Sequence, residues 1–197
     1  MLLIYLVLIY LALYIVIWLH EAGHGLVLYR YKCKENPFQV HVPFSIFFST
    51  PAPYNLEKED TLSKTQQYHI GMAGIAVNLL FGVPLAVYLL LADRGFSSLS
   101  FFLFAFTIFH LLEAASYLLI NNIFLSGDMV SVQKYKPWLR IPYFGIGLLT
   151  LYITVLLVMN SPEEWRPLFV IASVSMIICT AVGRVIFNIM NKRKLVK

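Results

Sequence analysis

Residues 20–24 read His-Glu-Ala-Gly-His, the HExxH pattern of zinc-dependent hydrolases. On a helix, His20 and His24 are four positions apart and project from one face, so that both imidazoles can bind the same ion. Glu21 stands where such sites carry the general base that acts on a water molecule. The pattern therefore predicts one Zn²⁺ per chain, with His20 and His24 as ligands and Glu21 as the catalytic residue.

A zinc ion held by two histidines needs a third protein ligand and keeps one position open for water. Two carboxylates qualify, Glu113 within an apolar stretch and Asp128 after it. Glu113 lies about 22 Å from the outer end of its stretch at about 1.5 Å per residue, which is near the depth expected for the histidines. Asp128 reaches that depth only if its loop dips back into the membrane, where protein must shield the backbone. The residues alone do not decide whether Glu113 or Asp128 is the third ligand.

The composition identifies the environment that must hold these residues. Of the 197 residues 59% are hydrophobic and 13% are charged, whereas soluble domains have about 45–50% and about 25%. This excludes a soluble globular domain, and the high hydrophobicity excludes a disordered chain. The net charge of +5 is not gathered on a water-exposed domain, so no nucleic-acid partner is expected. The sequence is that of an integral membrane protein.

Five apolar stretches of nearly membrane-spanning length follow one another along the chain. They cover about 1–19, 69–92, 99–120, 141–159 and 167–183, and a helix needs about 20 residues to cross a bilayer. We expect an all-α polytopic membrane protein with about five transmembrane helices. If Arg30 and Lys32 mark the interface, residues 20–24 lie roughly 9–15 Å inside it. Ionisable groups at such depth are costly and usually functional.

The positively charged residues predict the orientation. All of the 15 Lys and Arg residues except Arg94 and Arg166 lie between the first two stretches, between the third and fourth, or after the fifth. By the positive-inside rule that side is cytoplasmic. The N-terminus is then outside and the C-terminus cytoplasmic, as an odd number of spans requires.

The loop after the first helix carries the alternation of a β-strand. Apolar and polar residues alternate over 38–46, which is the period of a half-buried strand. We expect a short membrane-associated β-strand or hairpin here, with Pro43 restricting it to a sheet edge. Such an edge could hold a substrate in an extended form.

Three motifs together resemble the site-2 protease family of intramembrane zinc metalloproteases, including the sporulation factor IVFB branch. Residues 20–24 match its HExxH, residues 73–78 resemble its AGPxxN element, and residues 121–128 resemble its NxxPxxxxDG loop. The segment 38–46 falls where this family has a membrane-associated β-hairpin. The chain departs from the pattern at Ile75, which replaces a proline, and in the spacing of the last loop, which is one residue shorter.

The resemblance implies a fold, a site and an activity. It implies Asp128 as the third metal ligand, with Glu113 as an alternative ligand or as a group that contacts the ligands. The spacing of His110 and Glu113, three positions apart on one helix face, separately predicts either that the two pair with each other or that they lie near the zinc. It also implies roles for three amides in substrate binding or transition-state support; these are Asn78, Asn121 and Asn122.

The implied enzyme is a multi-pass zinc metalloendopeptidase of a bacterial plasma membrane. Residues 1–135 would form its catalytic core, and residues 136–197 two further helices with a basic tail. Its partners would be the lipid bilayer, a membrane protein or peptide substrate, and a regulatory membrane protein. The alternative is a zinc-binding membrane protein that regulates or handles metal without protease turnover.

Overall fold

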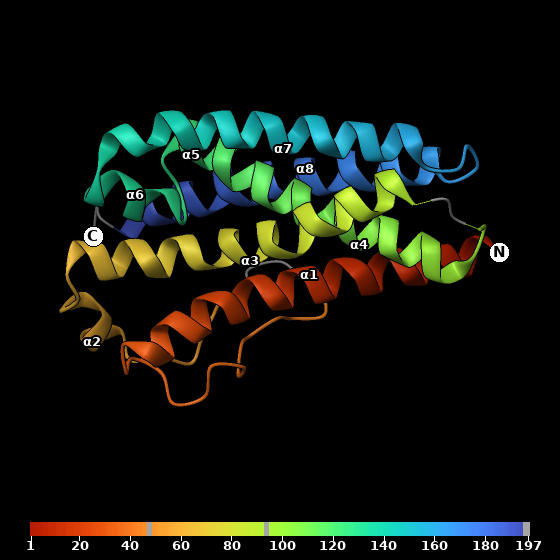
Figure 1. Cartoon of the computed structure of the whole chain (residues 1–197). Coiled ribbons are helices and arrows are strands. Elements are labelled where there is room, and N and C mark those ends of the chain that lie inside the picture. The colour runs from red at the N-terminus through yellow and green to blue at the C-terminus, as the bar shows by residue number, and fades with distance from the viewer. Residues whose placement is uncertain (47–48, 93–94, 195–197) are drawn as a thin grey trace.

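Five long helices form one bundle in the computed structural model, which describes residues 1–46, 49–92 and 95–194, with side chains described up to residue 183 (Figure 1). Five segments of the described chain are long and apolar enough to cross a membrane, as predicted. They are α1 (Leu2–Arg30), α3 (Lys64–Leu91), α4 (Ser98–Ser116) with its extension to Phe124, η2 (Pro137–Leu139) with α7 (Arg140–Asn160), and α8 (Arg166–Lys194) up to Gly183. Arg94 and Lys197, which contribute to the predicted orientation, lie outside the described residues.

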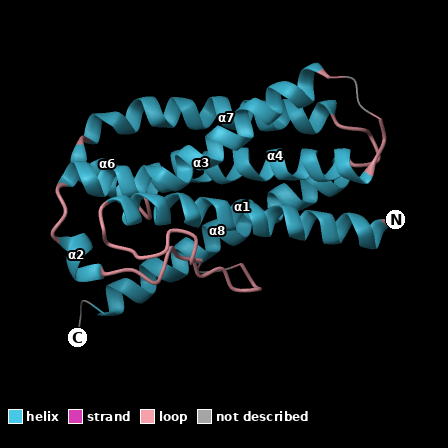
Figure 2. Ribbon diagram, turned by 60° about the horizontal axis from the view of Figure 1, so that its bottom comes forward, coloured by secondary structure: helices cyan, strands magenta, loops and turns pink. Residues whose placement is uncertain are grey.

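The start of α1 and the end of α8 at Lys194 lie at opposite ends of the bundle (Figures 1 and 2), as expected for an odd number of crossings. α4 is the central helix and is the most completely buried of the five. Its aromatic face packs against α1, α3, α7 and α8 in one cluster; the buried members include Val16, Leu89, Phe101, Phe104, Phe109, Leu157, Trp165 and Phe169. Apolar side chains cover much of the outer surface of α1 and α7, which suits a surface in contact with lipid.

The segment 38–46 does not form the predicted β-strand or hairpin. No β-strand is present in the described part of the chain, and the segment makes only an isolated antiparallel bridge between His41 and Thr50. Pro43 has no N–H to donate to a ladder, and Ile46 has a φ of 58°, which is left-handed backbone that a strand cannot contain. The alternation in sequence was therefore a misleading signal.

Interactions with α1 and with one lysine organise this loop instead. The hydroxyls of Tyr10 and Tyr14 donate to the carbonyl oxygens of Phe44 and Val42, so the loop runs back along α1 (Figure 2). The buried Lys34 ammonium donates to three loop carbonyls at 2.6–2.8 Å; these belong to Gln39, Pro51 and Pro53. The short helix α2 (Leu56–Asp60) follows, and a Ser63–Gln66 capping box starts α3.

A break after α4 reverses the chain. The helix widens into the π-helical turn η1 (Tyr117–Asn121) and ends with the short α5 (Asn122–Phe124). Leu125 and Gly127 then have φ values of 49° and 53°, and α6 (Met129–Tyr135) packs beside α3 and α7. The positive φ at Gly127 is one that glycine adopts without strain. Asp128 follows this turn directly.

Candidate metal centre

His20 and His24 lie one turn apart on α1 and face the bundle interior. Both side chains are buried, and their Nε2 atoms are 3.1 Å apart. This is the arrangement predicted from the HExxH spacing.

Each histidine is held through its Nδ1 atom by a group on α3. His24 Nδ1 lies 2.7 Å from the carbonyl oxygen of Ile70, and His20 Nδ1 lies 3.0 Å from the amide nitrogen Nδ2 of Asn78. The Ile70 carbonyl can only accept a hydrogen bond, so His24 donates its Nδ1–H, and in the neutral ring this leaves a lone pair on Nε2. The ring of His20 also stacks on Tyr117, with 4.8 Å between ring centres.

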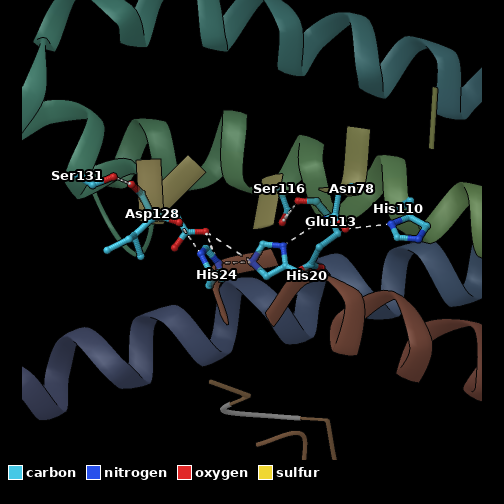
Figure 3. A network of polar contacts seen from close by, with 9 residues as sticks. His20, His24, Asn78, His110, Glu113, Ser116, Asp128 and Ser131 are labelled. Carbon is cyan, nitrogen blue, oxygen red and sulfur yellow. Dashed lines mark hydrogen bonds and ion pairs between the residues drawn. The ribbon is translucent and has the colours of Figure 1, made fainter. Parts of the chain in front are cut away.

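Asp128, rather than Glu113, is the carboxylate that meets the two histidines. Its Oδ2 atom lies 3.5 Å from His20 Nε2 and 3.4 Å from His24 Nε2 (Figure 3). Among the described residues these three form the group whose donor atoms could hold a metal ion. Asp128 Oδ2 is buried and has no hydrogen-bond partner among them, and such an atom calls for an explanation.

The charge state of Asp128 suits a ligand. Its burial opposes ionisation, but the neighbouring His24 and His20 outweigh that effect and hold its pKa below the ordinary value. The Ser131 hydroxyl donates to the backbone oxygen of Asp128 at 2.6 Å and fixes the first turn of α6. The carboxylate of Asp128 therefore projects from a hydrogen-bonded backbone turn.

The other two predicted amides lie beside the site and not in it. Asn121 accepts a hydrogen bond from the Ser126 hydroxyl at 2.9 Å and so stabilises the turn that precedes Asp128. Asn122 accepts from the Arg140 guanidinium and donates to the Arg140 carbonyl, so it joins the end of α4 to α7. Their observed contacts are structural.

Asn78 connects His20 to His110. Its Oδ1 lies 2.9 Å from His110 Nδ1, so His110, Asn78 and His20 form a buried row from α4 across α3 to α1 (Figure 3). Glu113, one turn after His110, is also buried and lies close enough to Glu21 for their carboxyls to interact electrostatically.

Gly74 allows α3 to approach the histidines closely. A Cβ atom at this position would lie 2.6 Å from the Nε2 atoms of both His20 and His24. No side chain fits there without displacing the rings. Position 74 therefore borders the space that the three donor atoms enclose.

A cavity of about 410 Å³ leads to the site. Glu21, His24 and Asp128 line it together with residues of the first loop, α2, α3 and α6; these include Pro51, Tyr54, Glu59, Asp60 and Lys134. Burial raises the pKa of Tyr54 to about 12, and Glu59 adds to this effect. Tyr54 is thus a neutral hydroxyl near physiological pH. A ligand in the cavity would contact Glu21 together with two of the candidate metal ligands, His24 and Asp128.

The sequence did not indicate that Gly74 and Tyr117 contact the two histidines. Gly74 falls inside the segment 73–78 but gave no sign of facing the histidines, and Tyr117 is one aromatic residue among many in an apolar chain. Their roles depend on how α3 and η1 pack against α1, which is a property of the tertiary structure.

Comparison with models of known protein families, with curated proteins and with solved structures gives no match to this chain. The resemblance to the site-2 protease family stays a prediction based on the three motifs.

Proposed function

We propose that this chain is an intramembrane zinc metalloprotease that hydrolyses peptide bonds of membrane-embedded or membrane-associated substrates. The observation that carries the proposal is the convergence of His20, His24 and Asp128 beside a cavity that His24, Asp128 and Glu21 line. A site made only to store a metal would have no need for a buried carboxylate beside the ligands.

The donor set supports zinc. Tetrahedral zinc with bonds of about 2.0–2.2 Å to nitrogen and oxygen has ligand atoms about 3.3–3.6 Å apart. The three separations here are 3.1, 3.4 and 3.5 Å. Two imidazoles and one carboxylate are a common catalytic zinc set that leaves a fourth position open. Asp128 supplies a negative charge that offsets the dication in a buried place.

In this proposal zinc and Glu21 have different roles in the hydrolysis. Bound zinc polarises the scissile carbonyl and makes water a stronger acid. Glu21 accepts the proton of the attacking water as its oxygen bonds to the carbonyl carbon. Glu21 then transfers that proton to the amine nitrogen as the carbon–nitrogen bond breaks. In total, the reaction consumes one water molecule and converts one peptide bond into one carboxyl group and one amine.

The position of the site favours substrates that reach it from within or along the membrane. His20 is ten residues before the end of α1 at Arg30, which corresponds to roughly 15 Å of helix. The cavity that leads to it is lined by the loop after α1 and by α2. A helical substrate must unwind there, because its carbonyls are otherwise engaged in hydrogen bonds.

We also propose that the N-terminus is outside and the C-terminus in the cytoplasm of a bacterial cell. The loop between α1 and α3, the loop between α4 and α7 and the C-terminal tail carry most of the positive charge. The cavity would then face the cytoplasmic side.

The test is a comparison of Glu21→Gln with the unaltered chain in proteoliposomes, using a set of single-span peptides that carry a fluorophore and a quencher. We expect cleavage by the unaltered chain and a loss of about 10²–10⁴-fold in Glu21→Gln, with zinc content unchanged. Glu57→Gln is the matched control, because Glu57 is exposed on α2. Equal activity of Glu21→Gln would refute the proposal. Zinc binding without any cleavage would favour a regulatory or metal-handling protein.

A further inference from the structure

A second cavity lies between α5 and the start of α7. Its volume is about 330 Å³, and it shares no lining residue with the cavity beside the histidines. Two of its lining residues are polar, Asn122 and Arg140. The others are apolar; they are Ile123, Pro137, Ile141 and Phe144. The cavity therefore places a cationic group next to a hydrocarbon wall.

The half-buried guanidinium of Arg140 has a charge that no described acidic group neutralises. Its Nε donates to Asn122 Oδ1 at 2.9 Å, its Nη1 donates to Gln133 Oε1 at 3.2 Å, and its Nη2 donates to the backbone oxygen of Asn122. These acceptors are all uncharged, and none of the ion pairs in the described part of the chain includes Arg140. A guanidinium has five N–H donors, so Nη1 and Nη2 each keep one N–H that no described residue accepts.

The apolar wall of this cavity faces outward from the bundle. Ile123 and Ile141 are both exposed, and both lie within segments that are long and apolar enough to span a membrane. In a bilayer such side chains contact acyl chains. Arg140 is the first residue of α7, so it lies near the end of its span, where lipid headgroups are expected. A soluble anion would use only the polar part of the cavity, whereas a phospholipid would use both parts.

The segment before α7 has the side chains of a membrane interface. Trp138 on η2 is exposed, and exposed tryptophans are typical of the headgroup region. The Lys136 ammonium lies 5.1 Å from the centre of the Tyr135 ring and, like Arg140, takes part in none of the ion pairs between described residues. Basic pockets between spanning helices are a recurrent binding place for anionic headgroups.

We propose that this cavity binds one anionic phospholipid, with its phosphate on the free N–H groups of Arg140 and its acyl chains along Ile141 and Phe144. Phosphate and guanidinium form charge-assisted hydrogen bonds, which are stronger than those between neutral groups. Phosphatidylcholine should bind less well, because its choline cation offsets the charge of the phosphate. The inference requires the helices to lie in a membrane, but it depends neither on the metal centre nor on protease activity.

Native mass spectrometry of the purified full chain tests the proposal. The chain is released from micelles that contain equal amounts of phosphatidylglycerol and phosphatidylcholine, and the retained lipids are counted. We expect one retained phosphatidylglycerol per chain, favoured at least about fivefold over phosphatidylcholine, which is the usual contribution of one basic group near an anionic headgroup. Equal retention of the two lipids would overturn the proposal.

Two neighbouring residues of α5 provide matched variants. Ile123 lines the cavity and Phe124 does not, although their side chains are similarly exposed, at 62% and 67%. Ile123→Glu adds a carboxylate to the wall that Arg140 shares and should abolish the preference for phosphatidylglycerol, whereas Phe124→Glu adds the same charge outside the cavity and should preserve it. Both variants keep the bonds of Arg140 to its neighbours, which Arg140→Gln would remove. Equal losses in the two variants would overturn the proposal.

Glycerol 3-phosphate distinguishes a lipid from a free phosphate. It carries a phosphate but no acyl chains, so it cannot use the apolar wall of the cavity. At millimolar concentration it should leave phosphatidylglycerol bound. Complete displacement would show that the cavity binds phosphate without regard to the acyl chains, and it would overturn the assignment to a phospholipid.

Discussion

Replacing Gly74 by alanine should disrupt the metal centre without any change to a ligand. The added Cβ would lie 2.6 Å from both histidine Nε2 atoms, whereas ordinary contacts of a Cβ begin near 3.4 Å. Either α3 or the rings must therefore shift by about 0.8 Å, beyond the roughly 0.5 Å that a functional site tolerates.

The partners of the histidines make this shift costly. The bonds of His24 and His20 to Ile70 and Asn78 are 2.7 and 3.0 Å long, and both partners lie on α3 itself. If α3 retreats by about 0.8 Å, both bonds stretch to or beyond the hydrogen-bond limit. We expect zinc affinity to fall roughly 100-fold or more, the scale that an ångström of misplacement costs at a catalytic site.

The assay is chelator competition on the purified chain, with thermal unfolding measured in parallel. Gly145→Ala is the matched control, because Gly145 is also within a long helix and nothing lies within 4 Å of its added Cβ. Both substitutions gain up to about 1 kcal/mol of helix propensity, so their difference isolates the contact with the histidines. Unchanged zinc affinity in Gly74→Ala would refute the reasoning.

Three further predictions concern the third ligand, the loop and the orientation. Asp128→Asn should lose bound zinc and activity together, because an amide is a weaker ligand than a carboxylate, whereas Glu113→Gln should keep its zinc; metal analysis that gives the reverse would make Glu113 the ligand. Lys34→Met should speed proteolytic cutting of the loop after α1, since three carbonyls lose a buried donor at about 1–3 kcal/mol; Lys64→Met, at an exposed site, should not, and equal rates would contradict this role. A reporter fused after Lys197 should be active only in the cytoplasm, and activity outside would invert the proposed orientation.

Much of the helical framework could be predicted, because it depends on local composition. A run of about 20 apolar residues without charge has few alternatives to a spanning helix, and the five predicted segments correspond to the five apolar helices. The four-residue spacing of His20 and His24 likewise fixes their common face.

The third ligand candidate could not be chosen by counting residues. The depth count favoured Glu113 because it assumes a straight helix that ends at the membrane surface. The chain instead widens into a π-helical turn and reverses through Leu125 and Gly127, which brings Asp128 to the histidines. Neither the π-helical turn nor the left-handed Leu125 has a clear signature in the sequence.

The loop after α1 was predicted wrongly for a related reason. Alternating hydrophobicity predicts a strand only where one face of it is buried, and none of the apolar residues of this segment is buried, with Phe38 and Phe44 exposed. The backbone is governed by Pro43, by the left-handed Ile46 and by the carbonyls that converge on Lys34. These contacts join residues up to 19 positions apart, beyond the range of a local pattern.

An anomalous-scattering map at the zinc absorption edge would test the central claim most directly. The account predicts one peak per chain, bounded by Nε2 of His20, Nε2 of His24 and Oδ2 of Asp128. A zinc-soaked crystal with no peak between these atoms, or with its peak on Glu113, would contradict it.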